Sequence, residues 1–280
     1  MAKIKAEKSK KMPAVFRNLG QAGLFLLKVP YYLGKGTVYA GKGIYHLAKK
    51  TDEVIEERKE KKKREKMNAK YEDFEVIHAQ EGDFEKWFNK IKDSDSKIGV
   101  ILGARGSGKT AFGIKFIENV YANDKCKCYA LGFNEKEMPS WIEVVDDISQ
   151  IKNDAFVLID EGGVLFNSRD SMSNANKLLS DLILVARHKN LSILFISQNS
   201  SNLDINILRQ ADFLALKPSS LLQKEFERKI VQKIYDGVSN KFEKFKDKEG
   251  LVYIYGDIFK GFVSNPLPSF WDTGISKSFR

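Results

Sequence analysis

Gly103-Ala104-Arg105-Gly106-Ser107-Gly108-Lys109-Thr110 is the stretch that decides which fold this chain can adopt. Its spacing, G-x-x-x-x-G-K-[ST], is that of the P-loop or Walker A motif, in which backbone N–H groups surround the phosphates of a nucleoside triphosphate. Lys109 is expected to reach the β- and γ-phosphates, and the hydroxyl of Thr110 is expected to bind Mg²⁺. All eight residues are therefore predicted to form the nucleotide-binding loop.

The segments on either side of this motif supply the context that it needs. Residues 97–102 form a short apolar run typical of a buried strand, and residues 111–117 carry apolar side chains at helical spacing. A strand, a glycine-rich turn and a helix in this order place the helix N-terminus against the phosphates. A glycine-rich turn that binds nothing is the alternative, and the flanking segments and the partner motif argue against it.

The partner motif is an unbroken apolar run, Ala155-Phe156-Val157-Leu158-Ile159, that ends in Asp160 and Glu161. Such a run is typical of a strand buried in a parallel sheet, and the two carboxylates indicate a Walker B motif. Asp160 is expected to hold Mg²⁺ through its water shell, and Glu161 to polarise the water that attacks the γ-phosphate. An ordinary solvated turn is the alternative.

A third apolar run, residues 191–196, precedes Ser197, Gln198 and Asn199. Polar residues at the carboxyl end of a central strand face the crevice where open α/β sheets bind ligands. Gln198 is therefore expected to contact the γ-phosphate or the attacking water and to report hydrolysis to the rest of the subunit. The alternative is a polar turn without a role in the reaction.

Arg187, His188 and Lys189 close a predicted helix that begins near residue 174. Cations are favourable at a helix C-terminus for purely electrostatic reasons, so a structural explanation exists for all three. Arg187 is nevertheless the candidate for an arginine finger, inserted into the site of a neighbouring subunit to neutralise charge in the transition state. Arg169 and Arg209 are competing candidates, and His188 is expected to cap or pack.

This order of motifs resembles the HerA/FtsK superfamily of ring-forming P-loop ATPases over roughly residues 95–220. The resemblance is strongest to the small genome-packaging ATPases of viruses with internal membranes and to zonula-occludens-toxin-like assembly ATPases. Only the combination of Asp160-Glu161, Arg187 and Gln198 points to this branch among P-loop proteins. The resemblance implies a hexameric motor, an arginine finger at Arg187 and a sensor at Gln198.

The positive charge of the chain is concentrated at its N-terminus. The net charge is +10, and residues 1–70 hold 19 Lys and Arg against 7 Asp and Glu, whereas the remainder is close to neutral. Residues 13–48 mix apolar and aromatic side chains with lysines, and Lys28 and Pro30 interrupt the apolar run too early for a transmembrane helix. We expect a basic amphipathic segment that lies on an anionic membrane, a capsid surface or vertex, or nucleic acid, or that packs on the protein itself.

Residues 53–70 alternate acidic and basic side chains at i,i+4 spacing, which predicts an exposed helix or helical linker. A motor that moves DNA needs cationic contacts to phosphates, and these are expected here or at Arg169 and Lys177. Further on, residues 221–235 are predicted to be helical, and residues 241–245 and 251–255 are predicted to pair as a β-hairpin. Cys126 and Cys128 alone do not make a zinc site, and reduced thiols fit an intracellular protein.

Together these patterns predict an α/β P-loop NTPase of the RecA-like (ASCE) type. A central, mostly parallel sheet with strands near residues 98, 127, 155, 192 and 213 is expected to be flanked by helices, with a basic helical arm before it and a β-hairpin after it. The expected domain organisation is an amphipathic arm over residues 1–50, a charged helical linker over 51–72 and the ATPase domain over 73–280.

The predicted function is ATP hydrolysis, with ATP and Mg²⁺ as cofactors, by a homo-oligomeric ring that is expected to be a hexamer. Double-stranded DNA is the expected substrate, and viral genome packaging is the most specific version. GTP is disfavoured because the Asn-Lys-x-Asp segment that reads guanine is absent. The alternatives are a membrane-associated assembly or secretion ATPase that acts on protein, and a module that binds ATP as a switch. The expected location is cytoplasmic or in the virion, with peripheral membrane contact through the arm.

Overall fold

The computed structural model describes residues 36–93, 96–161, 172–272 and 275. The chain divides into two compact units, Met1–Lys63 and Arg64–Arg280. The described part of the first unit belongs to one helix, α3 (Gly36–Glu65), so the predicted basic arm is helical where it is described. Residues 13–35 of the predicted amphipathic segment lie outside the described residues. Within these ranges, none of the helices combines the length and the apolar content that crossing a bilayer requires.

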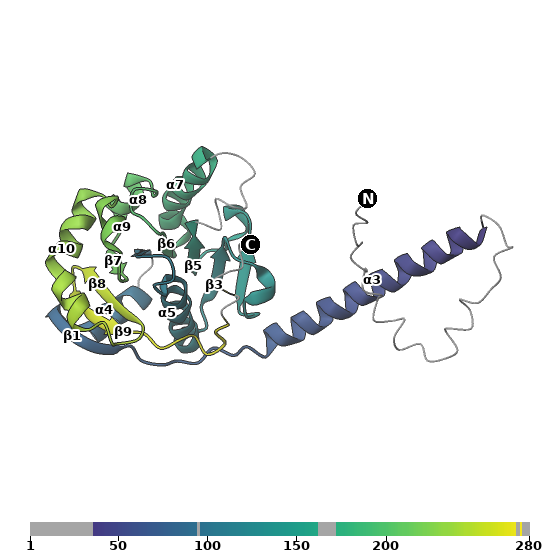
Figure 1. Ribbon diagram of the computed structural model, residues 1–280, viewed down its shortest axis with the longest axis horizontal. Helices are drawn as coiled ribbons and strands as arrows, with labels where there is room; N and C mark the ends of the chain where they lie inside the picture. The colour runs from purple at the N-terminus through teal and green to yellow at the C-terminus, as the bar shows by residue number, and fades with distance from the viewer. Residues whose placement is uncertain (1–35, 94–95, 162–171, 273–274, 276–280) are drawn as a thin grey trace, which may run out of the picture. The chain divides into compact units, whose positions relative to one another are not determined.

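The second unit is built on one nine-stranded sheet in the order β1-β9-β8-β7-β2-β6-β5-β3-β4 (Figure 1). Strands β7, β2, β6, β5, β3 and β4 are parallel neighbours, whereas β8, β9 and β1 extend the sheet with antiparallel pairs. The nine strands are β1 (Glu75–Gly82), β2 (Ile98–Leu102), β3 (Lys127–Leu131), β4 (Ile142–Val145), β5 (Ala155–Asp160), β6 (Leu191–Ile196), β7 (Phe213–Leu216), β8 (Leu251–Gly256) and β9 (Phe259–Ser264). The predicted α/β P-loop fold with a mostly parallel sheet is confirmed.

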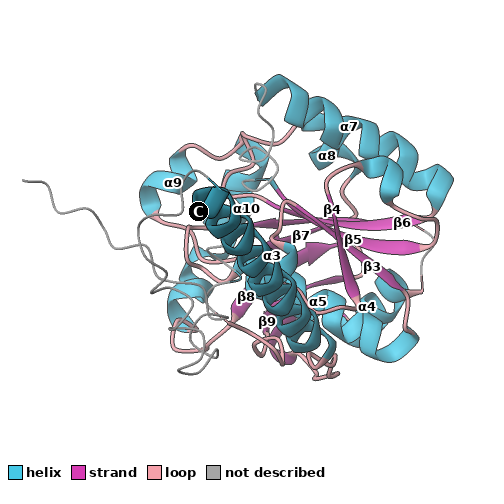
Figure 2. Cartoon of the chain, turned by 90° about the vertical axis from the view of Figure 1, so that its right-hand side faces the viewer, coloured by secondary structure: helices cyan, strands magenta, loops and turns pink. Residues whose placement is uncertain are grey.

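Helices cover both faces of this sheet, as Figure 2 shows in a second view. One buried cluster joins one face to α7, α8 and α10, and a second cluster joins the other face to α4 and α5. Side chains of one strand alternate between the clusters, as Val157 and Leu158 of β5 do. Burial on both faces explains why these strands are continuous apolar runs. The helices are α4 (Phe84–Lys92), α5 (Lys109–Asp124), α7 (Met172–Lys189), α8 (Ile205–Gln210), α9 (Leu221–Glu225) and α10 (Lys229–Lys244).

The predicted C-terminal hairpin exists, but its first strand was placed wrongly. The hairpin pairs β8 with β9, and residues 241–244 instead end helix α10. The cause is a helical period that runs on past residue 235, because Val231, Tyr235, Val238, Phe242 and Phe245 recur every three or four residues and pack on the same core cluster. The predicted helix over 221–235 is likewise divided, since α9 ends before residue 226 and α10 begins at 229.

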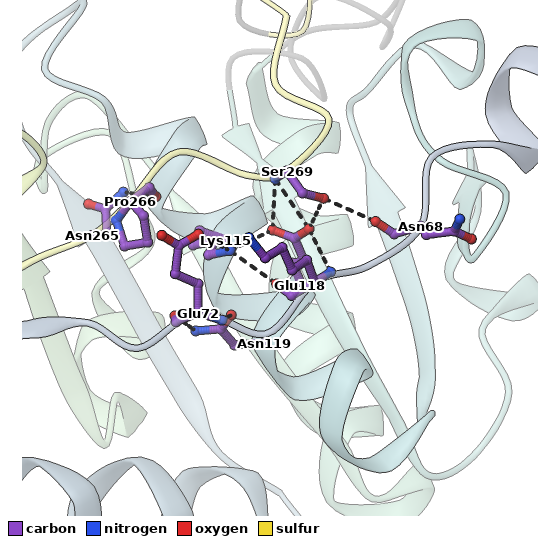
Figure 3. Close-up of polar contacts among 9 residues, drawn as sticks. Asn68, Glu72, Lys115, Glu118, Asn119, Asn265, Pro266 and Ser269 are labelled. Atoms are coloured by element: carbon purple, nitrogen blue, oxygen red, sulfur yellow. Dashed lines mark hydrogen bonds and ion pairs between the residues drawn. The ribbon is translucent and has the colours of Figure 1, made fainter.

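Helix α5 carries a buried polar cluster that ties two distant segments to it (Figure 3). The ammonium of Lys115 lies 3.0 Å from a carboxylate oxygen of Glu118, and both side chains are fully buried. Lys115 also donates to the backbone oxygen of Lys70, and Glu118 accepts from the amides of Lys70 and Ser269. The segment that follows α3 and the C-terminal tail are thus fastened to the helix that begins at the P-loop.

A second buried lysine, Lys217, holds together the residues before and after the hairpin. Lys217 follows β7, is 1% exposed, and donates hydrogen bonds of 2.7 Å to the Gly250 oxygen and to Oδ1 of Asn265. Burial lowers the pKa of Lys217 to about 7. A neutral amine keeps two N–H donors, so both hydrogen bonds remain available after Lys217 loses its proton.

Replacing Glu118 by Ala is expected to lower the free energy of unfolding by about 3–5 kcal/mol, because it leaves the buried charge of Lys115 with only the exposed carboxylate of Glu72, 3.7 Å away. Chemical denaturation measures the loss. The control is Lys248→Ala, which removes an exposed ion pair with Glu75 and is expected to cost less than about 1 kcal/mol. Equal losses in the two variants would contradict this account of the cluster.

The free energy of unfolding of the wild-type protein, minus that of the Lys217→Met variant, is expected to rise with pH. Above about pH 7 the folded chain holds Lys217 neutral, while the unfolded chain keeps it protonated up to its ordinary pKa. The unfolded state then binds more protons, so the free energy of unfolding gains up to about 1.4 kcal/mol per pH unit over the variant. Urea unfolding of both proteins at about pH 7 and about pH 9 tests this sign. A difference that does not change with pH would refute it.

Candidate active site

The P-loop connects the carboxyl end of β2 to the first turn of α5. Gly103 has φ 148° and Gly108 has φ 86°, values that favour glycine. A Cβ added to Gly103 would lie 2.6 Å from Cβ of Lys217, so the chain after β7 leaves no room for a side chain there. The loop is held by hydrogen bonds from the Ala104 amide to the Pro218 oxygen and from the Ser107 amide to the Ala104 oxygen.

The loop also has the features of a phosphate cradle. Gly108 caps α5 without a side-chain hydrogen bond, so the first-turn amides of this helix keep their partial positive charge. The hydroxyl oxygen of Ser107 is buried and makes no hydrogen bond to the part of the chain that the structure describes. Arg105 and Gly106 are exposed at the tip, and Thr110 lies in the first turn of α5. These residues fit the phosphates of a nucleotide.

Lys109 is the buried cation of this loop, with 8% of its surface exposed. Its ammonium donates hydrogen bonds of 2.8 Å to the carbonyl oxygens of Gly103 and Ala104. Burial lowers the pKa of Lys109 to about 8, while attraction to Asp160 and Glu227 opposes the shift. The lysine therefore lies between the loop and two buried carboxylates.

The two Walker B carboxylates are both buried at the carboxyl end of β5. Asp160 is the last residue of the strand, and Glu161 follows it. Burial raises the pKa of Glu161, the hydrogen bond from the Ser197 hydroxyl lowers it, and the charge of Asp160 raises it further. Ser197 thus contacts Glu161 directly from the end of β6.

The sheet order explains why these three segments meet. Strand β6 lies between β2 and β5 and is parallel to both. Its carboxyl end therefore lies between the P-loop and the Walker B carboxylates, and the loop that follows begins with Ser197 and Gln198. The side chain of Gln198 is exposed, and its backbone oxygen accepts a hydrogen bond from Gln223. Lys109, Asp160, Glu161 and Gln198, predicted separately from three motifs, come from one edge of the sheet.

The predicted arginines lie elsewhere. Arg187 is exposed near the end of α7, four residues before β6 begins, and Arg209 is exposed near the end of α8, four residues before β7 begins. Both therefore lie at the amino ends of parallel strands, the edge of the sheet opposite the P-loop. Arg169 lies outside the described residues, and nothing is described of the side chain of Lys177.

Three further residues border the site and are not part of any motif. They are Lys217 beneath Gly103, Gln223 on α9 and Glu227 before α10. Lys217 follows directly on the carboxyl end of a central strand, so its position along the sequence was a usable signal. Gln223 and Glu227 are brought to the site only by the tertiary packing of α9 and α10.

Part of the chain is similar to a known protein family. The family model described as zonular occludens toxin (Zot) matches residues 131–217, a range that contains the Walker B carboxylates, Arg187 and Gln198 and excludes the P-loop. No curated protein matches the chain.

Several solved structures resemble this chain at low sequence identity. The genome packaging NTPase B204 from Sulfolobus turreted icosahedral virus 2, in complex with sulfate, is 18% identical with a TM-score of 0.44, covering 62% of this chain and 98% of that one. The same protein in complex with ATP-gammaS gives 19% identity, a TM-score of 0.41 and coverage of 62% and 99%. EssC (ATPases 2 and 3) from Geobacillus thermodenitrificans gives 12% identity, a TM-score of 0.36 and coverage of 66% and 43%.

The buried Walker B carboxylates and the start of the loop after β6 lie within the residues that the family model matches, whereas the P-loop lies before them. The chain is a P-loop ATPase by its motifs and fold, and its residues 131–217 resemble the zonular occludens toxin (Zot) family.

Proposed function

We propose that this protein assembles into a homo-oligomeric ring, a hexamer, that hydrolyses ATP with Mg²⁺ and uses the energy to move double-stranded DNA. One observation carries the catalytic part of the proposal. The loop after β6 lies between the P-loop and the Walker B carboxylates, and its first residue, Ser197, donates a hydrogen bond to Glu161. Hydrolysis at Glu161 is thereby linked to a loop that carries Gln198.

The roles of the individual residues follow from this arrangement. The P-loop amides and Lys109 hold the phosphates, and Thr110 and Asp160 would hold Mg²⁺, which neutralises phosphate charge when it is bound. Glu161 orients the attacking water and accepts its proton, a role favoured by the burial that raises the pKa of its carboxyl. Gln198 contacts the γ-phosphate or the water from the neighbouring strand.

The position of Arg187 supports a role in a neighbouring subunit. Because Arg187 lies at the opposite edge of the sheet from the P-loop, it is distant from the site of its own chain and is free to enter that of another copy. Exposed apolar side chains flank the site on α9, between the two helices and at the start of α10, and are of the kind that a subunit interface covers. They are Leu221, Leu222, Phe226 and Ile230.

Double-stranded DNA is the substrate implied by the resemblance of the motifs to packaging ATPases. The basic residues of the arm, concentrated in the first 70 residues, offer contacts to phosphates. A membrane-associated ATPase that acts on protein is the second candidate, favoured by the mixture of apolar and basic side chains in the same arm. The arm is proposed to serve as the attachment to DNA, to a capsid vertex or to a membrane surface.

Glu161→Gln is expected to bind ATP with an affinity within about threefold of wild type and to lose hydrolysis by at least about a hundredfold, because the amide cannot accept the proton of the attacking water. Nucleotide binding and phosphate release measure the two effects separately. Full hydrolysis in this variant would remove Glu161 from its assigned role.

Mixing two inactive variants tests the arginine in the same reaction. Arg187→Ala and Glu161→Gln are each expected to be inactive alone, and their mixture is expected to recover part of the activity, because some interfaces then combine an intact Glu161 with an intact Arg187. Arg209→Ala is the matched control and is expected to retain activity alone. A mixture without any recovery would argue against an arginine supplied by the neighbour.

The rate of ATP hydrolysis per chain is expected to rise cooperatively with protein concentration and to increase further with linear double-stranded DNA. The DNA effect should weaken between low and moderate salt, because the contacts to phosphates are electrostatic. Hydrolysis that responds to anionic liposomes and not to DNA would instead support the membrane-associated ATPase. A rate per chain that does not change on dilution would favour a module that binds ATP as a switch.

A further inference from the structure

The segment from Gln223 to Arg228 is bound closely to the loop that follows β6. The hydroxyl of Ser201 donates to the Phe226 oxygen at 2.6 Å. The guanidinium of Arg228 donates to the oxygens of Ser200 at 2.9 Å and Leu203 at 2.8 Å. These contacts explain why the chain leaves helical geometry between α9 and α10, because its polar groups are used by the loop.

Gln223 makes the connection between this segment and the P-loop. Its side-chain Nε2 donates to the Gly103 oxygen at 3.2 Å and also to the backbone oxygen of Gln198. Lys109 donates to the same Gly103 oxygen at 2.8 Å. The side-chain amide of Gln223 therefore connects two groups of the site. One is the Gly103 carbonyl, which also binds Lys109, and the other is the backbone of Gln198, the proposed sensor.

Glu227 fixes the other end of the same loop. Its carboxylate accepts from the Ser200 amide at 2.7 Å, and the side chain is 4% exposed. The second carboxylate oxygen, Oε1, is buried and makes no hydrogen bond within the described parts of the chain. Glu227 also attracts Lys109. The loop after β6 is thus held at Gln198 and at Ser200 by residues of one short segment.

We propose that Gln223 is a positioning residue of the active site, which locks the loop after β6, and with it Gln198, to the P-loop carbonyl that Lys109 also contacts. This inference rests on the proposed role of Gln198 in hydrolysis. An amide has two N–H donors, and here each is used by a different wall of the site. A shift of the P-loop is thereby transmitted to the loop that carries Gln198, and the orientation of Gln198 depends on Gln223.

The kinetic test is a double-mutant cycle between Gln223 and Gln198. Gln223→Ala is expected to lower kcat about tenfold, as expected for the loss of two hydrogen bonds, and to change the affinity for ATP by less than about threefold. In the Gln198→Ala background the same substitution is expected to lower kcat by less than about twofold, because the residue that it positions is gone. Two effects that simply multiply would overturn the inference.

Two further variants separate positioning from folding. Gln223→Glu keeps the size of the side chain but sets a carboxylate against two carbonyl oxygens, so its kcat is expected to be at least as low as that of Gln223→Ala. Gln232→Ala removes hydrogen bonds to the oxygens of Lys224 and Glu225 in the same segment, with none to the P-loop. It is expected to keep kcat within about twofold of wild type. An equal loss in Gln232→Ala would show a structural role only.

Hydrogen exchange gives a readout that does not depend on hydrolysis. Binding of a slowly hydrolysed ATP analogue is expected to protect residues 103–110 and residues 197–203 in the wild type. In Gln223→Ala the protection of 103–110 should remain and that of 197–203 should be lost. Retained protection of both segments would overturn the inference, even if the protein proved not to move DNA. If the protein hydrolyses ATP and shows the predicted loss of protection but does not move DNA, the proposed motor function fails. The role of Gln223 still stands in that case.

Discussion

The parallel pairing of β6 with both β2 and β5 is the constraint on which the active site depends. Three strands that share one direction end at one edge, and their last residues lead into the P-loop, the loop that begins with Ser197 and the Walker B carboxylates. A strand inserted between the other two brings a polar loop into the middle of a site that otherwise consists of a cation and two anions. The hydrogen bond from Ser197 to Glu161 is the direct consequence of this register.

The site is connected to the rest of the unit through a few buried polar groups. Helix α5 begins at Lys109 and carries the ion pair of Lys115 and Glu118, which holds the segment after α3 and the C-terminal tail. Lys217, beneath the P-loop, holds the open end of the C-terminal hairpin, at Gly250 before β8 and Asn265 after β9. Buried polar groups of this kind are costly unless they are hydrogen-bonded or paired, so each of them fixes the position of its partners. Buried polar contacts therefore join the P-loop and helix α5 to the segment after α3, to the C-terminal hairpin and to the C-terminal tail.

The parts of the fold and site that depend on local pattern were predictable from the sequence. The motif at 103–110, the apolar run before Asp160 and the run before Ser197 each carry a recognisable signal, and the sheet brings them together as expected. The parts that depend on tertiary contact were not. No sequence pattern joins Gln223 to Gly103 or Glu227 to Ser200. The short alternation at 241–245 suggested a strand, but these residues continue the helical spacing of apolar residues that begins at Val231. The strands β1 and β4 at the borders of the sheet are largely exposed or short and give weaker signals than the central ones.

The central claim is that this site drives movement along double-stranded DNA. A triplex-displacement assay tests it most directly, with a third strand bound to linear duplex DNA and its release followed over time with ATP. The account predicts release that requires ATP hydrolysis and is absent with Glu161→Gln. Vigorous ATP hydrolysis in the presence of the duplex, with the third strand left in place, would contradict it.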